Sequence, residues 1–361
     1  MPAKRARSGC RRRANSCLPS QTDLMDCFQM ILFLASVLEQ LDLALEHIAK
    51  GDVHNARFGL MLTDNAVELV FHQIAKEKAP DLKSYSFLRE EYAHQDALNK
   101  ALGRNFDAKL KFAKIEASLS DEIAQTVTIL HGYRNEVYHV GLRHEAILPA
   151  LSALYFDTAC GYFGTYKPRG LGWSSNQKLP ERAKKYFHGH TTFPGGFDDF
   201  ANGCALLRKT CDHNPKTTIS ALADEMDEII YKQNVCIDIV ADGVYAGQQT
   251  TRDEAVVSTQ AWRLAFSEEG KAFAMNHSWS GNWLQLVEWL GKNYPHKFRS
   301  DPIPSWEKQA ARLRANQNPH TALSNYQSFM ASTADIREAL EESAAAAERE
   351  IDSAIDRARG K

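Results

Sequence analysis

The sequence predicts an all-α helical bundle in its first half, followed by a second domain that is mainly α or α+β. Apolar residues recur at three- and four-residue steps through most of residues 23–166, and the connections between these stretches are short. The 361 residues are enough for two domains with a core each, and 44% hydrophobic and 24% charged residues are typical of a globular protein. Because the net charge is only −2, any binding to nucleic acid must come from a local patch.

The chain begins with a basic arm over residues 1–22, which has no acidic residue before Asp23. Its composition predicts disorder. The arm is either a nucleic-acid contact, a solvated tail, or a segment upstream of a later start at Met25 or Met30. The apolar run at 30–38 is far shorter than the ~20 residues that span a bilayer. We therefore expect a core helix here, no membrane contact and a cytoplasmic location, rather than a signal peptide.

Five helices are expected in the bundle. They cover approximately residues 22–50, 53–78, 87–102, 120–140 and 145–162. Pro80 is expected to close the second helix, and Pro149 is tolerated in the first turn of the fifth. Ser120 is a suitable N-cap for the fourth helix, and Gly141 is a suitable C-terminal cap. The polar stretch between the third and fourth helices carries no expected element.

A domain boundary is expected in the Pro-, Gly- and Ser-containing segment 165–180. Beyond it, residues 218–231 predict a helix and residues 235–247 a strand and turn. The expected division is a basic arm at 1–22, a bundle at 23–166, a second domain of unassigned role at 167–331 and a solvated charged helix at 332–361.

The seven cysteines are odd in number and form no disulfide framework, so we expect reduced thiols in a cytosolic protein. One group raises the alternative of a zinc site. It consists of Cys204, Cys211 and His213, with His188 and His190 upstream. The group lacks a C-x2-4-C pair, which favours ordinary thiols and imidazoles. No metal and no cofactor are expected.

The fourth helix carries an unusual cluster of polar residues near its end, "YRNEVYHVG" at 133–141. At about 100° per residue, Arg134 falls within the apolar stripe of this helix, so it needs an acidic partner, a wet seam or an interface. Asp64 and Glu68, one turn apart on the second helix, are the best acids. Arg134 and His139 diverge by roughly 140°. They reach one site only if the helix loosens at its end or a second copy contributes.

The residue types in this cluster fit one kind of chemistry. His139 lies in the last turn, where the helix dipole favours an imidazolium that can serve as general acid or base. Arg134 can hold a phosphate through two hydrogen bonds, and Asn135 can orient either group. These are the needs of phosphodiester cleavage by an RNA 2′-hydroxyl without a metal. The alternative from the residues alone is a structural Arg–acid pair and a histidine satisfied at a helix end.

The segment "YRNEVYH" resembles the R-x4-6-H signature of the HEPN superfamily, in which a polar residue often follows the arginine. The preceding "ALEHIAKGDVHNARFGLMLTDNAVELV" is similar to the first helix pair of such domains, and the resemblance covers roughly residues 24–166. It implies a dimeric all-α domain whose two R-x4-H helices face each other. Many members are metal-independent endoribonucleases of toxin–antitoxin, abortive-infection and CRISPR-associated systems; others have lost catalysis and serve as binding or scaffolding helices.

Carried over by position, the resemblance makes Arg134 and His139 catalytic and Asn135 their polar partner. An acid of the second helix, Glu68 or Asp64, supports the arginine, and Tyr138 joins the supporting residues. In one subgroup a tyrosine two residues after the histidine is modified by an antitoxin; this chain has Gly141 there.

The expected protein is therefore an RNA-cleaving toxin or phage-defence effector. It would act as a homodimer, with an antitoxin or regulatory protein as a further partner. The alternative is a non-catalytic module for dimerisation, nucleotide binding or protein interaction.

Overall fold

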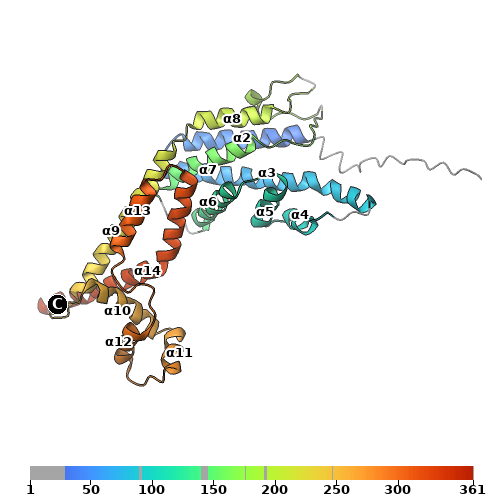
Figure 1. The fold of residues 1–361 in the computed structure, drawn as a ribbon. Helices are drawn as coiled ribbons and strands as arrows, with labels where there is room; N and C mark the ends of the chain where they lie inside the picture. The colour runs from blue at the N-terminus through green and yellow to red at the C-terminus, as the bar shows by residue number, and fades with distance from the viewer. Residues whose placement is uncertain are drawn as a thin grey trace, which may run out of the picture.

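The computed structural model describes residues 29–88, 92–139, 145–174, 176–190, 193–245 and 247–360, and within these ranges the side chains of residues 83–88 and 139 are left undescribed. Every regular element in these ranges is a helix, with one isolated bridge between His190 and Phe193 (Figure 1). The expected all-α character is confirmed for the described chain. The basic arm at 1–22 and the expected cap at Gly141 lie outside the described residues.

The described part of the first half contains six helices. They are α2 (Met30–Ile48), α3 (Val53–Leu88), α4 (Gln95–Ala101), α5 (Phe106–Glu116), α6 (Asp121–His139) and α7 (Leu148–Phe163). α3 packs between α2 and α7 and also contacts α4, α5 and α6. Fully buried side chains such as Leu38, Phe71 and Phe156 fill the space between these helices. Burial of this kind, rather than helix propensity, stabilises such elements.

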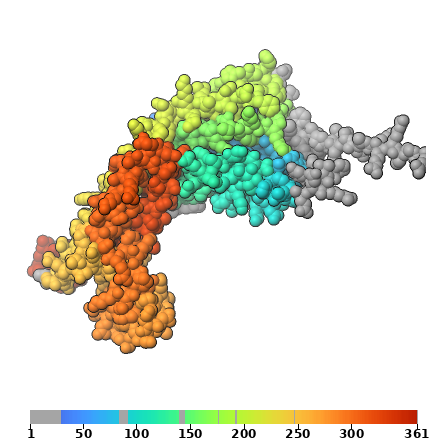
Figure 2. Space-filling model, in the orientation of Figure 1, coloured from blue at the N-terminus to red at the C-terminus, as the bar shows by residue number. Residues whose placement is uncertain are grey.

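In the second half, the described residues form a short 3-10 helix and seven α-helices. They are η1 (Glu181–Tyr186), α8 (Asp199–Cys211), α9 (Pro215–Asp242), α10 (Arg252–Ala265), α11 (Glu268–Asn276), α12 (Trp283–Asn293), α13 (Ile303–Arg314) and α14 (Pro319–Ala358). α8 returns to pack on α2 and α7. α9, α13 and α14 form an arm that leaves the bundle, and α10, α11 and α12 form a lobe at its far end (Figures 1 and 2).

A single hydrophobic core extends from the bundle into the arm. It includes Ile31 of α2, Tyr155 of α7, Leu222 of α9 and Leu340 of α14. The lobe has a small core of its own around Leu290. The segment 165–180 therefore separates two stretches of sequence that share buried contacts.

Pro80 does not end the second helix, contrary to the expectation from sequence. α3 continues through it to Leu88. A proline inside a helix removes the hydrogen bond to the carbonyl four residues earlier, here that of Lys76. Both Lys76 and Pro80 are exposed, so water can satisfy that carbonyl.

Three further expectations from sequence are wrong. Residues 235–247 form no strand, because α9 continues to Asp242 and buries Cys236, Ile237 and Ala241. A short apolar run does not distinguish a strand from a buried helical face. Residues 332–358 are helical, as expected, but they are the second half of α14 and pack against α9 rather than being solvated on all sides. The third helix is only Gln95–Ala101, and the polar stretch after it contains α5.

No helix among the described residues combines the length and the apolar character that crossing a bilayer requires.

Candidate functional site

α6 is the helix that carries the polar cluster, and the sequence explains its start and its packing. The Ser120 hydroxyl accepts a hydrogen bond from the Ile123 amide at 3.3 Å, as an N-cap does. Val127, Leu130 and Val137 are buried against the bundle. On another side, Tyr133 is buried beside α14 and its hydroxyl donates to Oε1 of the Gln327 side chain at 3.4 Å. α6 is thus held between the bundle and the arm.

Arg134 lies at the edge of the apolar stripe, with its side chain 29% exposed. Its Nε is buried and lies 3.4 Å from Oδ2 of Asp64 on α3, an ion-pair distance beyond good hydrogen-bond geometry. Its Nη1 donates to Oδ1 of Asn135 at 2.9 Å. The guanidinium also lies over the Tyr138 ring, 5.6 Å from its centroid. No other hydrogen bond of this guanidinium is found within the described part of the chain.

Asp64 is the centre of this arrangement and is completely buried. Its Oδ1 accepts a hydrogen bond from the Tyr155 hydroxyl of α7 at 2.8 Å and one from His131 Nδ1 of α6 at 2.9 Å. With Arg134 added, three side chains from two helices surround one carboxylate. A buried carboxylate requires partners of this kind. Burial and the neighbouring Asp64 charge raise the pKa of Tyr155 well above its ordinary value, so its hydroxyl remains a proton donor.

His131 is held from both sides. One ring nitrogen donates to Asp64, and the ring stacks in parallel on Phe106 of α5, with the centroids 3.7 Å apart. Because a carboxylate only accepts hydrogen bonds, the proton of His131 that points to Asp64 is on Nδ1. α3, α5, α6 and α7 therefore all contribute to the position of Arg134.

The expected supporting residues divide between two roles. Asp64, rather than Glu68, contacts Arg134; Glu68 accepts a hydrogen bond from the buried Lys109 at 2.6 Å. Tyr138 is exposed beside Arg134. His139 is the last residue of α6, and its side chain lies outside the described residues, so its place relative to Arg134 and Asn135 stays a prediction.

A second guanidinium, not anticipated from the sequence, reaches the same end of α6. Nη2 of Arg57 on α3 donates to the Val137 carbonyl oxygen at 3.4 Å. That carbonyl belongs to the last turn, whose oxygens have no partner within the helix. Arg57 lies one residue from the apolar stripe of its helix, a signal too weak to select it by sequence. His131 had a better signal, since it precedes Arg134 by one turn on the same face.

The cysteine and histidine group of the second half is dispersed among other contacts. Cys204 is buried and burial raises its pKa, while burial raises the pKa of Cys211 to about 11. His213 Nε2 lies 2.8 Å from the Thr218 hydroxyl. Among the described residues there is no group of three or more His, Cys, Asp or Glu side chains placed to hold a metal ion.

Comparisons of the chain with models of known protein families, with curated proteins and with solved structures find no match. The class of the protein therefore rests on the helical fold and on the arrangement around Arg134.

Proposed function

We propose that the chain is a metal-independent endoribonuclease of HEPN type, acting as a toxin or phage-defence effector from a composite site in a homodimer. The position of Arg134 carries this proposal. Its Nε is buried at ion-pair distance from the carboxylate of Asp64, while the side chain as a whole is 29% exposed at the surface of α6. A guanidinium held at one edge can present the other to a phosphate with little loss of side-chain entropy.

In the proposed reaction, the 2′-oxygen of RNA attacks the adjacent phosphorus and the bond from phosphorus to the 5′-oxygen breaks. His139 takes the proton of the 2′-hydroxyl or supplies one to the leaving 5′-oxygen. Arg134 binds the phosphate and stabilises the charge that develops on it, and Asn135 orients the guanidinium. The products carry 2′,3′-cyclic phosphate and 5′-hydroxyl ends.

A dimer through α6 is part of the proposal, and the outer side of this helix supports it. Thr128 and Glu136 are exposed, and Gly132 lies between them on the same side. A Cβ atom at Gly132 would meet no atom within 4 Å, so this side is open to a second helix. Two facing copies would bring Arg134 and His139 of different chains to one phosphate, which a single ideal helix does not do.

The alternative function is a non-catalytic module that binds a protein, a nucleotide or a second copy. The contact between Arg134 and Asp64 is also consistent with this alternative, because a buried Nε beside a buried carboxylate can be a purely structural ion pair. The two functions differ in what His139 contributes. Only the nuclease requires its imidazole.

The test compares wild type with His139→Ala during expression in a bacterial host, followed by inspection of total RNA. We expect growth arrest and RNA fragmentation with wild type alone. His188→Ala, which removes an imidazole 74% exposed in the second half, is the matched control and should behave as wild type. Equal growth and intact RNA for wild type and His139→Ala would contradict the toxin proposal.

Purified protein provides the mechanistic test. Cleavage of a single-stranded RNA should continue in excess EDTA. The 5′-hydroxyl ends should accept a phosphate from polynucleotide kinase directly, while the 3′ ends should resist ligation until their cyclic phosphates are opened and removed. Cleavage that disappears with EDTA and returns with a divalent metal would rule out the metal-free mechanism.

A further inference from the structure

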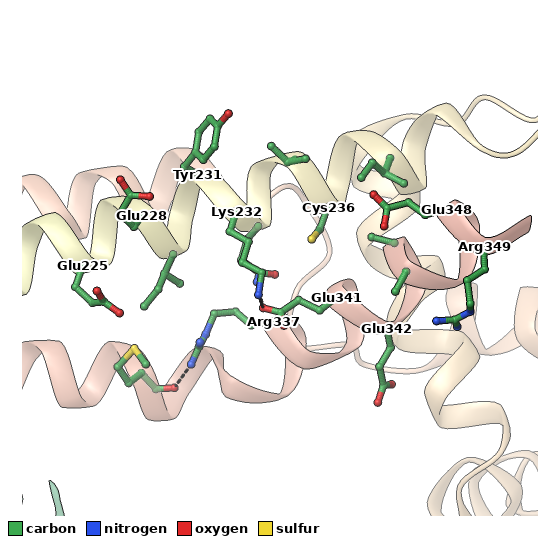
Figure 3. A pocket seen from close by; sticks show the side chains of 17 residues that line it. Glu225, Glu228, Tyr231, Lys232, Cys236, Arg337, Glu341, Glu342, Glu348 and Arg349 are labelled. Carbon is green, nitrogen blue, oxygen red and sulfur yellow. Dashed lines mark hydrogen bonds and ion pairs between the residues drawn. The ribbon is translucent and has the colours of Figure 1, made fainter. Parts of the chain in front are cut away.

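A groove of about 1180 Å³ lies between α9 and α14 in the arm (Figure 3). Its lining runs from Glu225 to Ile239 on α9 and from Met330 to Arg349 on α14. At 1.5 Å per residue, these stretches are about 20–28 Å long. α13 covers a different side of α9, where Arg314 pairs with Asp224 and Asp227. The groove therefore has the length of about four to five helical turns and is open to solvent.

The floor of the groove is apolar. It is formed by Ile229, Cys236 and Ile239 from α9 and by Met330, Ala344 and Ala345 from α14. Tyr231 and Val235, one turn apart at its edge, are 69% and 39% exposed. A contiguous exposed apolar surface with a polar border is typical of a recognition site. Two parallel ridges with such a floor match the apolar face of an amphipathic helix.

The rim is mainly acidic (Figure 3). The groove is lined by five glutamates and by only three basic residues, which are Lys232, Arg337 and Arg349. Lys232 is paired with Glu341 at 3.1 Å. The other four glutamates form no ion pair with any described residue; they are Glu225, Glu228, Glu342 and Glu348. Lysine and arginine side chains along the flanks of a bound helix would meet these carboxylates, which selects a basic partner.

Gln233 supplies an independent sign of an occupant. It is completely buried and lines the groove; its Nε2 donates to Glu341 Oε1 at 2.7 Å, but its own Oε1 has no hydrogen-bond partner. Buried acceptors are nearly always paired, so a donor is missing here.

Arg337 limits where the basic residues of a partner can lie. It is half-buried and donates to the Thr333 hydroxyl and the Met330 carbonyl, both at 3.0 Å, without contacting a carboxylate. Burial lowers its pKa. A partner cation directly above it would be repelled, so the partner's charges belong along the glutamate rim.

We propose that this groove binds an amphipathic α-helix of a partner protein, apolar on its buried face and rich in lysine or arginine on its flanks. This site is separate from α6 and does not depend on RNA cleavage. It gives the second half of the chain a role in protein recognition.

The test uses an 18-residue fluorescein-labelled peptide of leucine and lysine, spaced as an amphipathic helix, and the same peptide with glutamate in place of lysine. Fluorescence anisotropy with the full chain should show binding of the lysine peptide alone, weakening as salt is raised. Glu228→Lys should weaken binding by about 10-fold or more. Asp352→Lys makes the same charge change at an exposed position of α14 outside the groove and should leave binding unchanged.

Equal losses for Glu228→Lys and Asp352→Lys, or equal binding of the glutamate peptide, would overturn the proposal, because either result means binding without the groove. Tyr231→Ala tests the apolar edge and should also weaken binding. Its control is Leu206→Ala, an exposed apolar residue on α8. Analytical ultracentrifugation of the chain alone tests whether the groove binds a second copy. An oligomer that Tyr231→Ala converts to a monomer would show this and would overturn the proposal.

Discussion

Nε of Arg134 lies 3.4 Å from Oδ2 of Asp64, across the contact between α6 and α3. Because Asp64 is completely buried and also bound by Tyr155 and His131, the direction of the guanidinium is set from inside the bundle. A residue at the surface is thereby oriented through Asp64 and Tyr155, which are completely buried. Changes to the surface end and to the buried end of this contact should therefore have different effects.

Changing the surface end should affect RNA cleavage. We expect Arg134→Lys to lower the initial rate by about 100-fold or more, because an ammonium replaces the planar fork with a point charge. Arg169→Lys is the matched control, since Arg169 makes a two-pronged pair with Asp81 away from α6. Rates are measured on one labelled RNA with each purified variant. Full activity of Arg134→Lys would contradict bidentate phosphate binding.

Changing the buried end should affect stability. Tyr155→Phe removes a hydrogen bond to a buried carboxylate and should lower the free energy of unfolding by about 1.5–3 kcal/mol. Tyr326→Phe is a close control: its hydroxyl is equally buried but has no hydrogen-bond partner, so its removal should cost little. Urea unfolding of both variants gives the comparison. A similar loss for both would mean that the contact with Asp64 contributes nothing specific.

The sequence was informative about α6 because periodicity placed Arg134 in an apolar stripe and so demanded an acid. It narrowed the choice to Asp64 or Glu68, which are one turn apart. The sequence could not choose between them, because the choice depends on Lys109. This residue lies on α5, a helix that the sequence did not predict, and it forms an ion pair with Glu68. The contact of Tyr155 with Asp64 could not be predicted either, since nothing in the local sequence distinguishes a tyrosine that binds a carboxylate from one that fills the core.

α14 provides a prediction about the tail of the chain. Leu340 is completely buried between the arm helices, and Leu340→Ala should lower the free energy of unfolding by about 2–5 kcal/mol. Ile355→Ala, a large-to-small change 15 residues further along the same helix at a 40% exposed position, should cost well under half of that. Thermal and urea unfolding of the two variants measure the difference. Equal effects would mean that α14 is a solvated tail after all.

The sequence located most of the bundle and much less of the second half, for physical reasons. Caps and prolines marked α6 and α7 well. α9 and α14 were harder, because each is apolar on one side only and its charged side suggested a solvated or irregular segment. α9 and α14 form because they bury their apolar faces against each other. Residues about 100 positions apart meet in this contact, so it leaves no local signal in the sequence.

The seam between bundle and arm should respond to pH. Burial lowers the pKa of His320, whose Nδ1 lies 2.9 Å from the Thr126 hydroxyl, and it also lowers the pKa of His213. The folded state therefore binds fewer protons than the unfolded state below the ordinary histidine pKa of about 6.5. The free energy of unfolding should be largest above that pH and decrease as the pH falls through 6.5 toward the lowered folded value.

His320→Asn tests this, because an asparagine amide can replace Nδ1 without titrating. The variant should show a shallower loss of stability between pH 7 and pH 5, measured by urea unfolding at each pH. His188→Asn, at an exposed histidine, should keep the wild-type slope. A wild-type slope in His320→Asn would show that other groups cause the acid sensitivity.

The length of α14 has a mechanical consequence. This one helix of 40 residues touches α6 near its start, through Ser324 to Gln125 and His320 to Thr126, and contacts the lobe near its middle, where Arg263 pairs with Glu338. A helix of that length measures about 60 Å, and a tilt of about 5° at one end moves the other by about 5 Å. α14 therefore couples the lobe to α6: a tilt of this helix that moves its contacts with the lobe also moves Ser324 and His320 against the second turn of α6, about two turns before Arg134.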